Sequence, residues 1–205
     1  MKKLMHFAAA SLIVFAVACK KDKKEGDDTN ADTNVETTTE STTADDTPKA
    51  EYTNVDGKLR VKLDAKSDSG VSGNVVFTEA NGIVTMIAVM SGLTEGTHAI
   101  HLHEKSDCSS PDGKSTGGHW NPTAQPHGKW GSDKGYHKGD IGNFTADANG
   151  NGTVTHITNE WCIGCGDPQK DILGKAVIVH QGTDDFTSQP TGAAGGRVSC
   201  GAVIQ

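Results

Sequence analysis

The sequence predicts an all-β protein, built as an antiparallel β-sandwich or β-barrel. It contains 25 glycines and only 5% aromatic residues, a balance that favours a turn-rich β protein over a helical one. Several short segments alternate apolar and polar residues with turn signals between them, and none shows a helical period. Asn81-Gly82 separates two such segments, and this dipeptide is a strong hairpin signal because both turn positions favour positive φ.

The strands are predicted from period-two alternation and from one continuous apolar run. In 59–64 three aliphatic residues alternate with three charged ones, whereas AVIVH at 176–180 is typical of a buried strand. DANGNG at 147–152 matches the start of a calcium-binding loop. Thr158 stands where that loop needs a glutamate, so a simple turn is predicted. The expected strands are 59–64, 71–79, 83–90, 97–103, 141–145, 153–157, 176–180 and 198–204.

Residues 1–19 have the features of an export signal. Two lysines follow Met1, and the apolar run 7–18 is too short to span a bilayer. The run ends in small residues before Cys19 and resembles a bacterial lipoprotein signal, so Cys19 is expected to carry lipid. Ala16 departs from that pattern, which usually has a larger aliphatic residue there. The alternative is an ordinary signal peptide cleaved nearby; both predict export.

Residues 20–51 are rich in Thr, Asp, Glu and Lys and contain almost nothing to bury. Such a segment cannot offset its ordering entropy, so we predict a disordered tether that precedes a folded domain at 52–205. We expect a periplasmic or cell-envelope lipoprotein that meets the membrane only through its N-terminal lipid. The formal net charge is -7, and nucleic-acid phosphates need a basic face, so no nucleic-acid partner is expected.

The segment 101–140 contains most of the residues that carry chemistry. His101 and His103 are two residues apart in a predicted strand, so both imidazoles are expected on one face, with Ile100 and Leu102 in the core. A long loop follows, and loops of this length inside a compact domain are usually functional. A metal is the simplest agent that would order it. The segment contains five of the nine histidines and ends at an aspartate: His101, His103, His119, His127, His137 and Asp140.

A sixth histidine, His180, ends the apolar strand 176–180. Imidazole suits zinc and copper, and a carboxylate beside histidines is compatible with tetrahedral zinc. His98 and His156 fall in strand-like segments where a surface position is expected, and a structural role is the simpler interpretation for both. The six histidines and Asp140 therefore predict a metal site.

Six motifs give the chain a resemblance to copper/zinc superoxide dismutases. The likeness extends over 59–205, and the motifs occur in the order and at the spacing that the family shows. It implies a Greek-key antiparallel β-sandwich or barrel of the immunoglobulin-like type, with long metal-binding and electrostatic loops. The motifs are HLH at 101–103, GGHWNP at 117–122, PHG at 126–128, HKGDIGN at 137–143, IVH at 178–180 and GGR-x-x-CG at 195–201.

The resemblance implies one copper and one zinc ion per subunit, and superoxide as the substrate. Two superoxide ions and two protons would give dioxygen and hydrogen peroxide, with redox cycling at copper and a proton from His119. Asp184 would orient a ligand of each metal, and Arg197 would attract and position the anion. The implied copper ligands are His101, His103, His119 and His180, and the implied zinc ligands are His119, His127, His137 and Asp140.

The net charge of the folded part affects how strongly an anionic substrate would be attracted to the site. The part from Tyr52 contains 12 Lys and Arg against 16 Asp and Glu, so a local field must attract the anion. Arg197 is the expected attractor, with Lys134 or Lys138 as candidate helpers. The loop 185–196 contains no lysine, which predicts weaker long-range steering than in animal members of the family.

Four cysteines remain when Cys19 is set aside. The resemblance implies a disulfide between Cys108 and Cys200. Cys162 and Cys165 form a CxxC, for which two interpretations stay open. In an exported protein the pair is most simply a local disulfide, and the alternative is a soft thiolate site for copper(I).

The sequence as a whole favours an exported copper/zinc superoxide dismutase. Two other classes remain as alternatives: a protein that buffers or delivers copper and zinc, and a structural domain of the same fold. Either would tolerate loss of Arg197 or of a ligand, and none is lost. A homodimer is compatible with the sequence, although no apolar patch stands out in it.

Overall fold

The computed structural model describes residues 57–205, so the predicted export signal, Cys19 and the predicted tether lie outside the described residues. Within 57–205 no helix has the length and apolar character needed to cross a membrane. One short 3-10 helix, η1, spans Lys114–Thr116. The strands are β1 (Lys58–Ala65), β2 (Ser72–Ala80), β3 (Ile83–Ser91), β4 (Gly96–His103), β5 (Gly142–Ala146), β6 (Gly152–Thr158), β7 (Lys175–His180) and β8 (Arg197–Val203).

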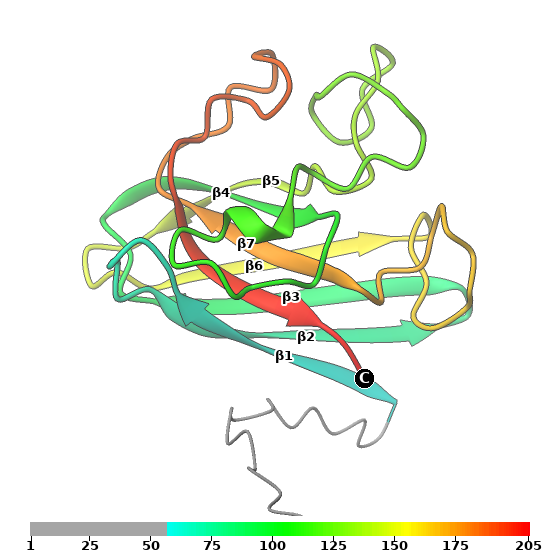
Figure 1. Ribbon diagram of the computed structural model, residues 1–205, viewed down its shortest axis with the longest axis horizontal. Coiled ribbons are helices and arrows are strands. Elements are labelled where there is room, and N and C mark those ends of the chain that lie inside the picture. Colours follow the sequence, from blue (N-terminus) through cyan, green and yellow to red (C-terminus); the bar gives the residue numbers. More distant parts are fainter. Residues whose placement is uncertain (1–56) are drawn as a thin grey trace, which may run out of the picture. The chain divides into compact units, whose positions relative to one another are not determined.

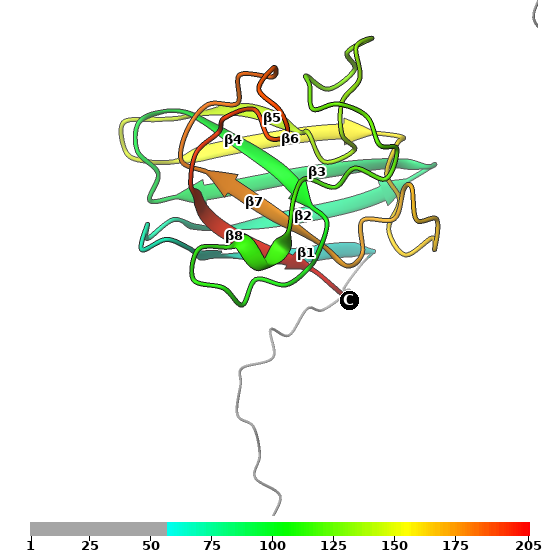
Figure 2. The ribbon, with the colours of Figure 1, turned by 45° about the horizontal axis from the view of Figure 1, so that its top comes forward.

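The eight strands form a closed antiparallel barrel in the order β1-β2-β3-β6-β5-β4-β7-β8. Strands β4, β5 and β6 follow one another as neighbours, and β7 returns to pair with β4. This order is a Greek key. Figures 1 and 2 show that the long β4–β5 connection and the β7–β8 connection rise from the same side of the barrel. The predicted all-β fold is confirmed.

The β2–β3 hairpin follows directly from its two turn residues. Ala80 pairs with Ile83, so the loop consists only of Asn81 and Gly82. Their φ angles are 53° and 72°, in the left-handed region that asparagine and glycine tolerate best. Each predicted strand agrees with the observed one to within one residue at each end.

The barrel interior is filled by the alternate residues of each strand. In β1 the buried positions are Leu59, Val61 and Leu63, as alternation predicts. Trp161, which follows β6, and Phe77 of β2 are the two largest fully buried side chains and lie in a tilted contact. Every strand therefore has one face fixed by the core.

Strands β4 and β7 differ because both of their faces are buried. Ile100 and Leu102 point into the barrel and are fully buried. His101 and His103 lie on the outer face, as predicted, yet they are also fully buried. Since the two long connections rise on this side (Figure 1), they cover an outer face that would otherwise meet water.

Candidate metal centre

Four histidines form the first group of converging side chains. His101 and His103 come from β4, His180 ends β7, and His119 is held against His103 by an isolated β-bridge in the β4–β5 connection. One nitrogen from each ring lies within 4.8 Å of the others, and all four residues are buried. Three of the four rings therefore stand on strands of the barrel.

The second group combines three histidines with a carboxylate from the β4–β5 connection. One Asp140 oxygen lies 2.8 Å from Nδ1 of His119 and 3.2 Å from Nδ1 of His137. The other lies 3.0 Å from Nδ1 of His127 and accepts the backbone N–H groups of Gly128 and His137. Three nitrogens and one carboxylate are a donor set that suits tetrahedral zinc.

His119 belongs to both groups. Its ring centroid is 4.0 Å from that of His101 and 5.3 Å from that of His127. Its Nδ1 faces Asp140, while its Nε2 belongs to the first group and has no hydrogen-bond partner. A single imidazole thus joins the two ligand sets.

The hydrogen bonds leave one nitrogen of most of these rings free to coordinate. His103 Nδ1 donates to the carbonyl of Gly117, so its buried Nε2 carries the lone pair. His180 Nδ1 approaches the carbonyl of Gly195 at 3.4 Å, and its Nε2 is likewise unpartnered. Buried nitrogens without partners are costly unless a ligand binds them. Those that lack a hydrogen-bond partner in the two groups are His101 Nδ1, His103 Nε2, His119 Nε2, His127 Nδ1, His137 Nδ1 and His180 Nε2.

Asp184 connects the two groups by accepting a hydrogen bond from one histidine of each. One oxygen accepts from Nε2 of His101 and the other from Nε2 of His127, each at 2.9 Å. The carboxylate is completely buried, and it also accepts the backbone N–H of Phe186. Burial alone would raise its pKa, but the hydrogen bonds from both histidines outweigh it and lower the pKa. Asp184 therefore fixes the tautomers of both rings, with Nδ1 left toward the metals.

Two residues that the motifs do not mark hold this bridge in place. Gly192 passes so close to the Asp184 carboxylate and the His127 ring that a Cβ there would overlap both, and its φ is positive at 69°. Gln189 accepts the backbone N–H of His127 and donates to its carbonyl. Nothing in the sequence links Gln189 to a residue 62 positions away.

Burial favours the neutral form of the histidines in the first group. It lowers the pKa of His101, and it lowers the pKa of His103 and His180 well below the usual value. For His119 burial is again the largest cause, and the pKa is about 4. Burial would also lower the pKa of His127, but Asp140 and Asp184 outweigh it and raise the pKa to about 9. Neutral imidazole is the form that binds metal.

Arg197 stands at the edge of the first group. Its guanidinium donates to the carbonyls of Gly113 and Gly117 and to the Thr116 hydroxyl, at 2.8, 2.8 and 2.9 Å. The Gly117 carbonyl also accepts from His103, so the arginine and this histidine share an anchor. The positive charge of Arg197 adds to the lowering of the pKa of His103, which places that charge close to the first group.

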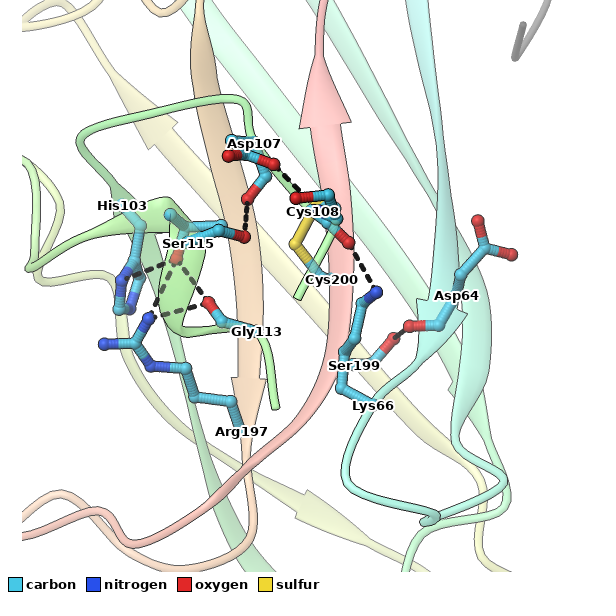
Figure 3. The surroundings of a disulfide bond; sticks show 12 residues. Asp64, Lys66, His103, Asp107, Cys108, Gly113, Ser115, Arg197, Ser199 and Cys200 are labelled. Atoms are coloured by element: carbon cyan, nitrogen blue, oxygen red, sulfur yellow. Dashed lines mark hydrogen bonds between the residues drawn. A yellow bond between two sulfur atoms is a disulfide. The ribbon is translucent and has the colours of Figure 1, made fainter. Parts of the chain in front are cut away.

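The disulfide between Cys108 and Cys200 ties the Arg197-binding loop to β8. Figure 3 shows it joining the start of the β4–β5 connection to the strand that begins with Arg197. Lys66 donates to the carbonyl of Cys108 from the β1–β2 connection. The strand and the loop that hold the guanidinium are thus covalently joined.

The structure corrects the sequence-based predictions for His98 and Lys138 and agrees with the one for His156. His98 is buried rather than on the surface, because its ring lies within reach of the carbonyls of His180 and Thr94. Lys138 is not free to attract an anion, since it pairs with Glu160. His156 packs between the rings of two tryptophans and belongs to neither metal group, in keeping with a structural role.

Cys162 and Cys165 are joined by a disulfide in the β6–β7 connection. Asp171 lies beside them, and its carboxylate accepts three backbone N–H groups of the surrounding loop. This geometry agrees with the simpler of the two interpretations, a local disulfide between Cys162 and Cys165. A copper(I) site would need both thiols free.

A Greek-key barrel whose connections bury six histidines and one aspartate in two groups is a protein that can hold two metal ions. The family model for copper/zinc superoxide dismutase matches residues 71–203, and the chain belongs to that family.

Solved structures agree with this assignment. The chain is 30% identical to a double mutant of a SOD-like protein from Bacillus subtilis in which a tyrosine and a proline are replaced by histidine. That match has a TM-score of 0.63 and covers 71% of this chain and 97% of the other. A structure of the clock protein EA4 is 32% identical, with a TM-score of 0.62 and coverage of 71% and 92%. The SOD-like protein from Bacillus subtilis without those replacements is 28% identical, with a TM-score of 0.62 and coverage of 71% and 97%.

Proposed function

We propose that this protein catalyses the disproportionation of superoxide, with copper in the first group and zinc in the second. Two superoxide ions and two protons become one dioxygen and one hydrogen peroxide. One observation carries the proposal: four buried imidazoles bring unpartnered nitrogens close together beside Arg197. A protein that only stored metal would not need a fixed guanidinium at that point.

The two donor sets differ in what they favour. Four imidazole nitrogens, three of them on rigid strands, suit copper, whereas the loop-borne set of three nitrogens and a carboxylate suits zinc. When bound, copper supplies a reversible one-electron change, which redox-inert zinc cannot. Asp184 accepts from one histidine of each group, His101 and His127, and Asp140 accepts from His119, so the two carboxylates fix the loop histidines relative to those on the strands.

Arg197 is the group that would receive the substrate. Three hydrogen bonds fix its guanidinium, so no reorganisation is needed when an anion arrives. Burial lowers its pKa, with Asp112 opposing the shift, yet a guanidinium remains charged at neutral pH. A fixed cation in a partly buried site acts on an anion more strongly than an exposed one.

His119 is the residue at which we place proton delivery. Its buried ring is neutral near pH 7, because burial holds its pKa at about 4. Nε2 has no hydrogen-bond partner and carries the lone pair of the ring, so it is the atom that would hold the proton for the second superoxide. Asp140 holds Nδ1 of the same ring and keeps its orientation.

We also propose that the protein is exported and anchored to the cell envelope through Cys19. The two disulfides support this, because such bonds persist outside the reducing cytoplasm. The mass of the mature N-terminal peptide tests the anchor: lipid on Cys19 supports it, and an unmodified N-terminus elsewhere contradicts it.

The dismutation rate of zinc-loaded protein, measured as copper is added, tests the proposed activity. We expect the rate to rise with copper and to level off at one equivalent per chain. Copper uptake without dismutation would contradict the proposal and favour a protein that buffers or delivers metal.

Arg197→Gln is expected to lower the second-order rate constant for superoxide by about 10-fold or more, because the local attraction for the anion is lost. Stopped-flow decay of superoxide at several ionic strengths measures the change. The wild-type rate should fall with added salt, and the variant rate should depend on salt less steeply.

Arg60→Gln is the matched control, since Arg60 is the other arginine of the sequence and lies exposed on β1. It removes the same charge and should leave the rate unchanged. Arg197→Lys keeps the charge but not the planar fork, and an intermediate rate is expected. Equal rates for Arg197→Gln and Arg60→Gln would remove Arg197 from the proposal.

A further inference from the structure

The ring of His137 is oriented differently from the other histidines of the second group. His127 donates from Nε2 to Asp184, and Nε2 of His119 belongs to the first group. In the described part of the chain no protein group hydrogen bonds to Nε2 of His137, while its Nδ1 lies 3.2 Å from Asp140. Histidines that bind metal usually have a partner on the other ring nitrogen, because that partner fixes the orientation of the ring. The His137 ring must therefore be placed in another way.

The two residues that flank His137 are held by one carboxylate of the β6–β7 connection. The Tyr136 hydroxyl donates to one oxygen of Glu160 at 2.6 Å, and Nζ of Lys138 pairs with the other oxygen. Burial would raise the pKa of Glu160, but the hydrogen bonds from Lys138 and Tyr136 outweigh it and lower the pKa. An ionised carboxylate therefore joins the chain on both sides of the ligand.

The next residue of the same connection holds the backbone after the ligand. Nε1 of Trp161 donates to the carbonyl of Lys138 at 2.8 Å. Trp161 is 1% exposed, and its ring packs against those of Phe77 and Trp130, so this donor has a fixed position. Trp130 also packs on the ring of Tyr136, with 5.1 Å between the centroids. We call Glu160 and Trp161 the 160–161 clamp.

We propose that Glu160 and Trp161 are positioning residues for His137 as a zinc ligand. The inference deepens the proposed function and rests on its assignment of zinc to the second group. Because the clamp fixes the residues before and after His137, it limits the directions in which the imidazole can point. Asp140 accepts the backbone N–H of His137, so the same fixed segment also holds the carboxylate of the group. The clamp itself contacts neither metal group.

A purely structural role for Glu160 makes a different prediction. The side chains of Lys138 and Glu160 are 18% and 28% exposed, and ion pairs in contact with solvent contribute little to the stability of a fold. A structural tie between two connections would act on folding and on both metal groups alike. A positioning residue for His137 should act on the second group, which contains this ligand, and leave the first group unchanged.

Glu160→Gln tests the proposal, because one amide oxygen cannot accept from Tyr136 and Lys138 as two carboxylate oxygens do. We expect the zinc affinity to fall by about 10-fold, the lower end of the range for residues that orient a ligand. Equilibrium competition with a chromophoric zinc chelator measures the change. Glu95→Gln is the matched control, since it removes the same charge from an exposed residue just before β4.

Two further measurements separate positioning from a general loosening of the fold. Cobalt(II) bound in place of zinc absorbs visible light in a way that depends on the angles between its ligands. Its spectrum should change in Glu160→Gln and match the wild type in Glu95→Gln. The copper affinity of the zinc-saturated protein should be the same in both variants, because the clamp does not contact the first group.

The proposal is overturned if Glu160→Gln binds zinc as tightly as Glu95→Gln, or if its cobalt spectrum matches that of the wild type. Equal losses of zinc and copper affinity would also overturn it, in favour of a structural role for Glu160. A wild type that binds no zinc would overturn both this inference and the assignment of zinc to the second group. Zinc binding that is equal in the wild type and in Glu160→Gln removes the clamp alone and leaves that assignment in place.

Discussion

Asp184→Asn is expected to lower the zinc affinity of the protein by about 10- to 100-fold, the range typical for loss of a residue that orients a ligand. The Asp184 carboxylate accepts from Nε2 of His101 and Nε2 of His127. Asparagine keeps the shape but offers only one acceptor, so its NH₂ group must face one imidazole N–H. That ring must turn or move its proton to Nδ1, the nitrogen that faces the metal.

Equilibrium competition with a chromophoric zinc chelator measures this change, and a dismutation assay on the same samples follows copper. Asp185→Asn is a close control, because it removes the same charge from the next residue. The Asp185 side chain accepts from Thr187 and Ser188 in an exposed turn, and its substitution leaves the backbone N–H that donates to the Gly192 carbonyl in place. A zinc affinity for Asp184→Asn within about twofold of the control would show that the bridge does not orient these ligands.

The strands of this barrel could be predicted because the burial pattern and the turn residues of each strand are visible in its own short stretch of sequence. The alternation in 59–64 reports one buried face, and Asn81-Gly82 reports a two-residue turn. The Greek-key order was available only from the family resemblance, because β3 pairs with β6 across a gap of more than 60 residues. Such a pairing leaves no local pattern.

Alternation was also misapplied to one histidine of β4. His98 was predicted at the surface, yet it shares a strand face with the core residues Ile100 and Leu102, is 3% exposed and packs beside the Phe144 ring. A pattern of period two shows which residues share a face, and it does not show what covers that face. The same limit applies to Lys138, whose partner Glu160 lies in another connection.

The ligands themselves could be identified because their chemistry restricts them to histidine and aspartate. The residues that hold the ligands could not, since they act through backbone groups and ordinary side chains. Thr116 belongs to no recognisable motif, yet its hydroxyl donates to the Gly113 carbonyl, accepts from Arg197 and lies 3.3 Å from Nδ1 of His103. Gln189 is similar, with both of its contacts to the His127 backbone.

His119→Gln is expected to lower dismutation by about 10²- to 10⁴-fold, the range for loss of a positioned proton donor. His119 gives Nε2 to the first group and Nδ1 to the second, so its replacement removes one nitrogen from each. Glutamine cannot present two nitrogens in opposite directions in one plane. Zinc affinity and the dismutation rate should therefore fall together. Replacement of a histidine that belongs to the first group only should lower the rate without removing a zinc ligand.

His156→Gln separates this effect from the loss of any buried histidine. His156 contacts the rings of Trp130 and Trp161 and belongs to neither group, so its replacement should lower the melting temperature but leave the rate per bound copper unchanged. Metal content and melting temperature are measured on both variants. If His119→Gln binds both metals with wild-type affinity and turns over at the wild-type rate, a bridging imidazole is not part of the mechanism. If it loses zinc alone and keeps its rate, the proton must come from another group.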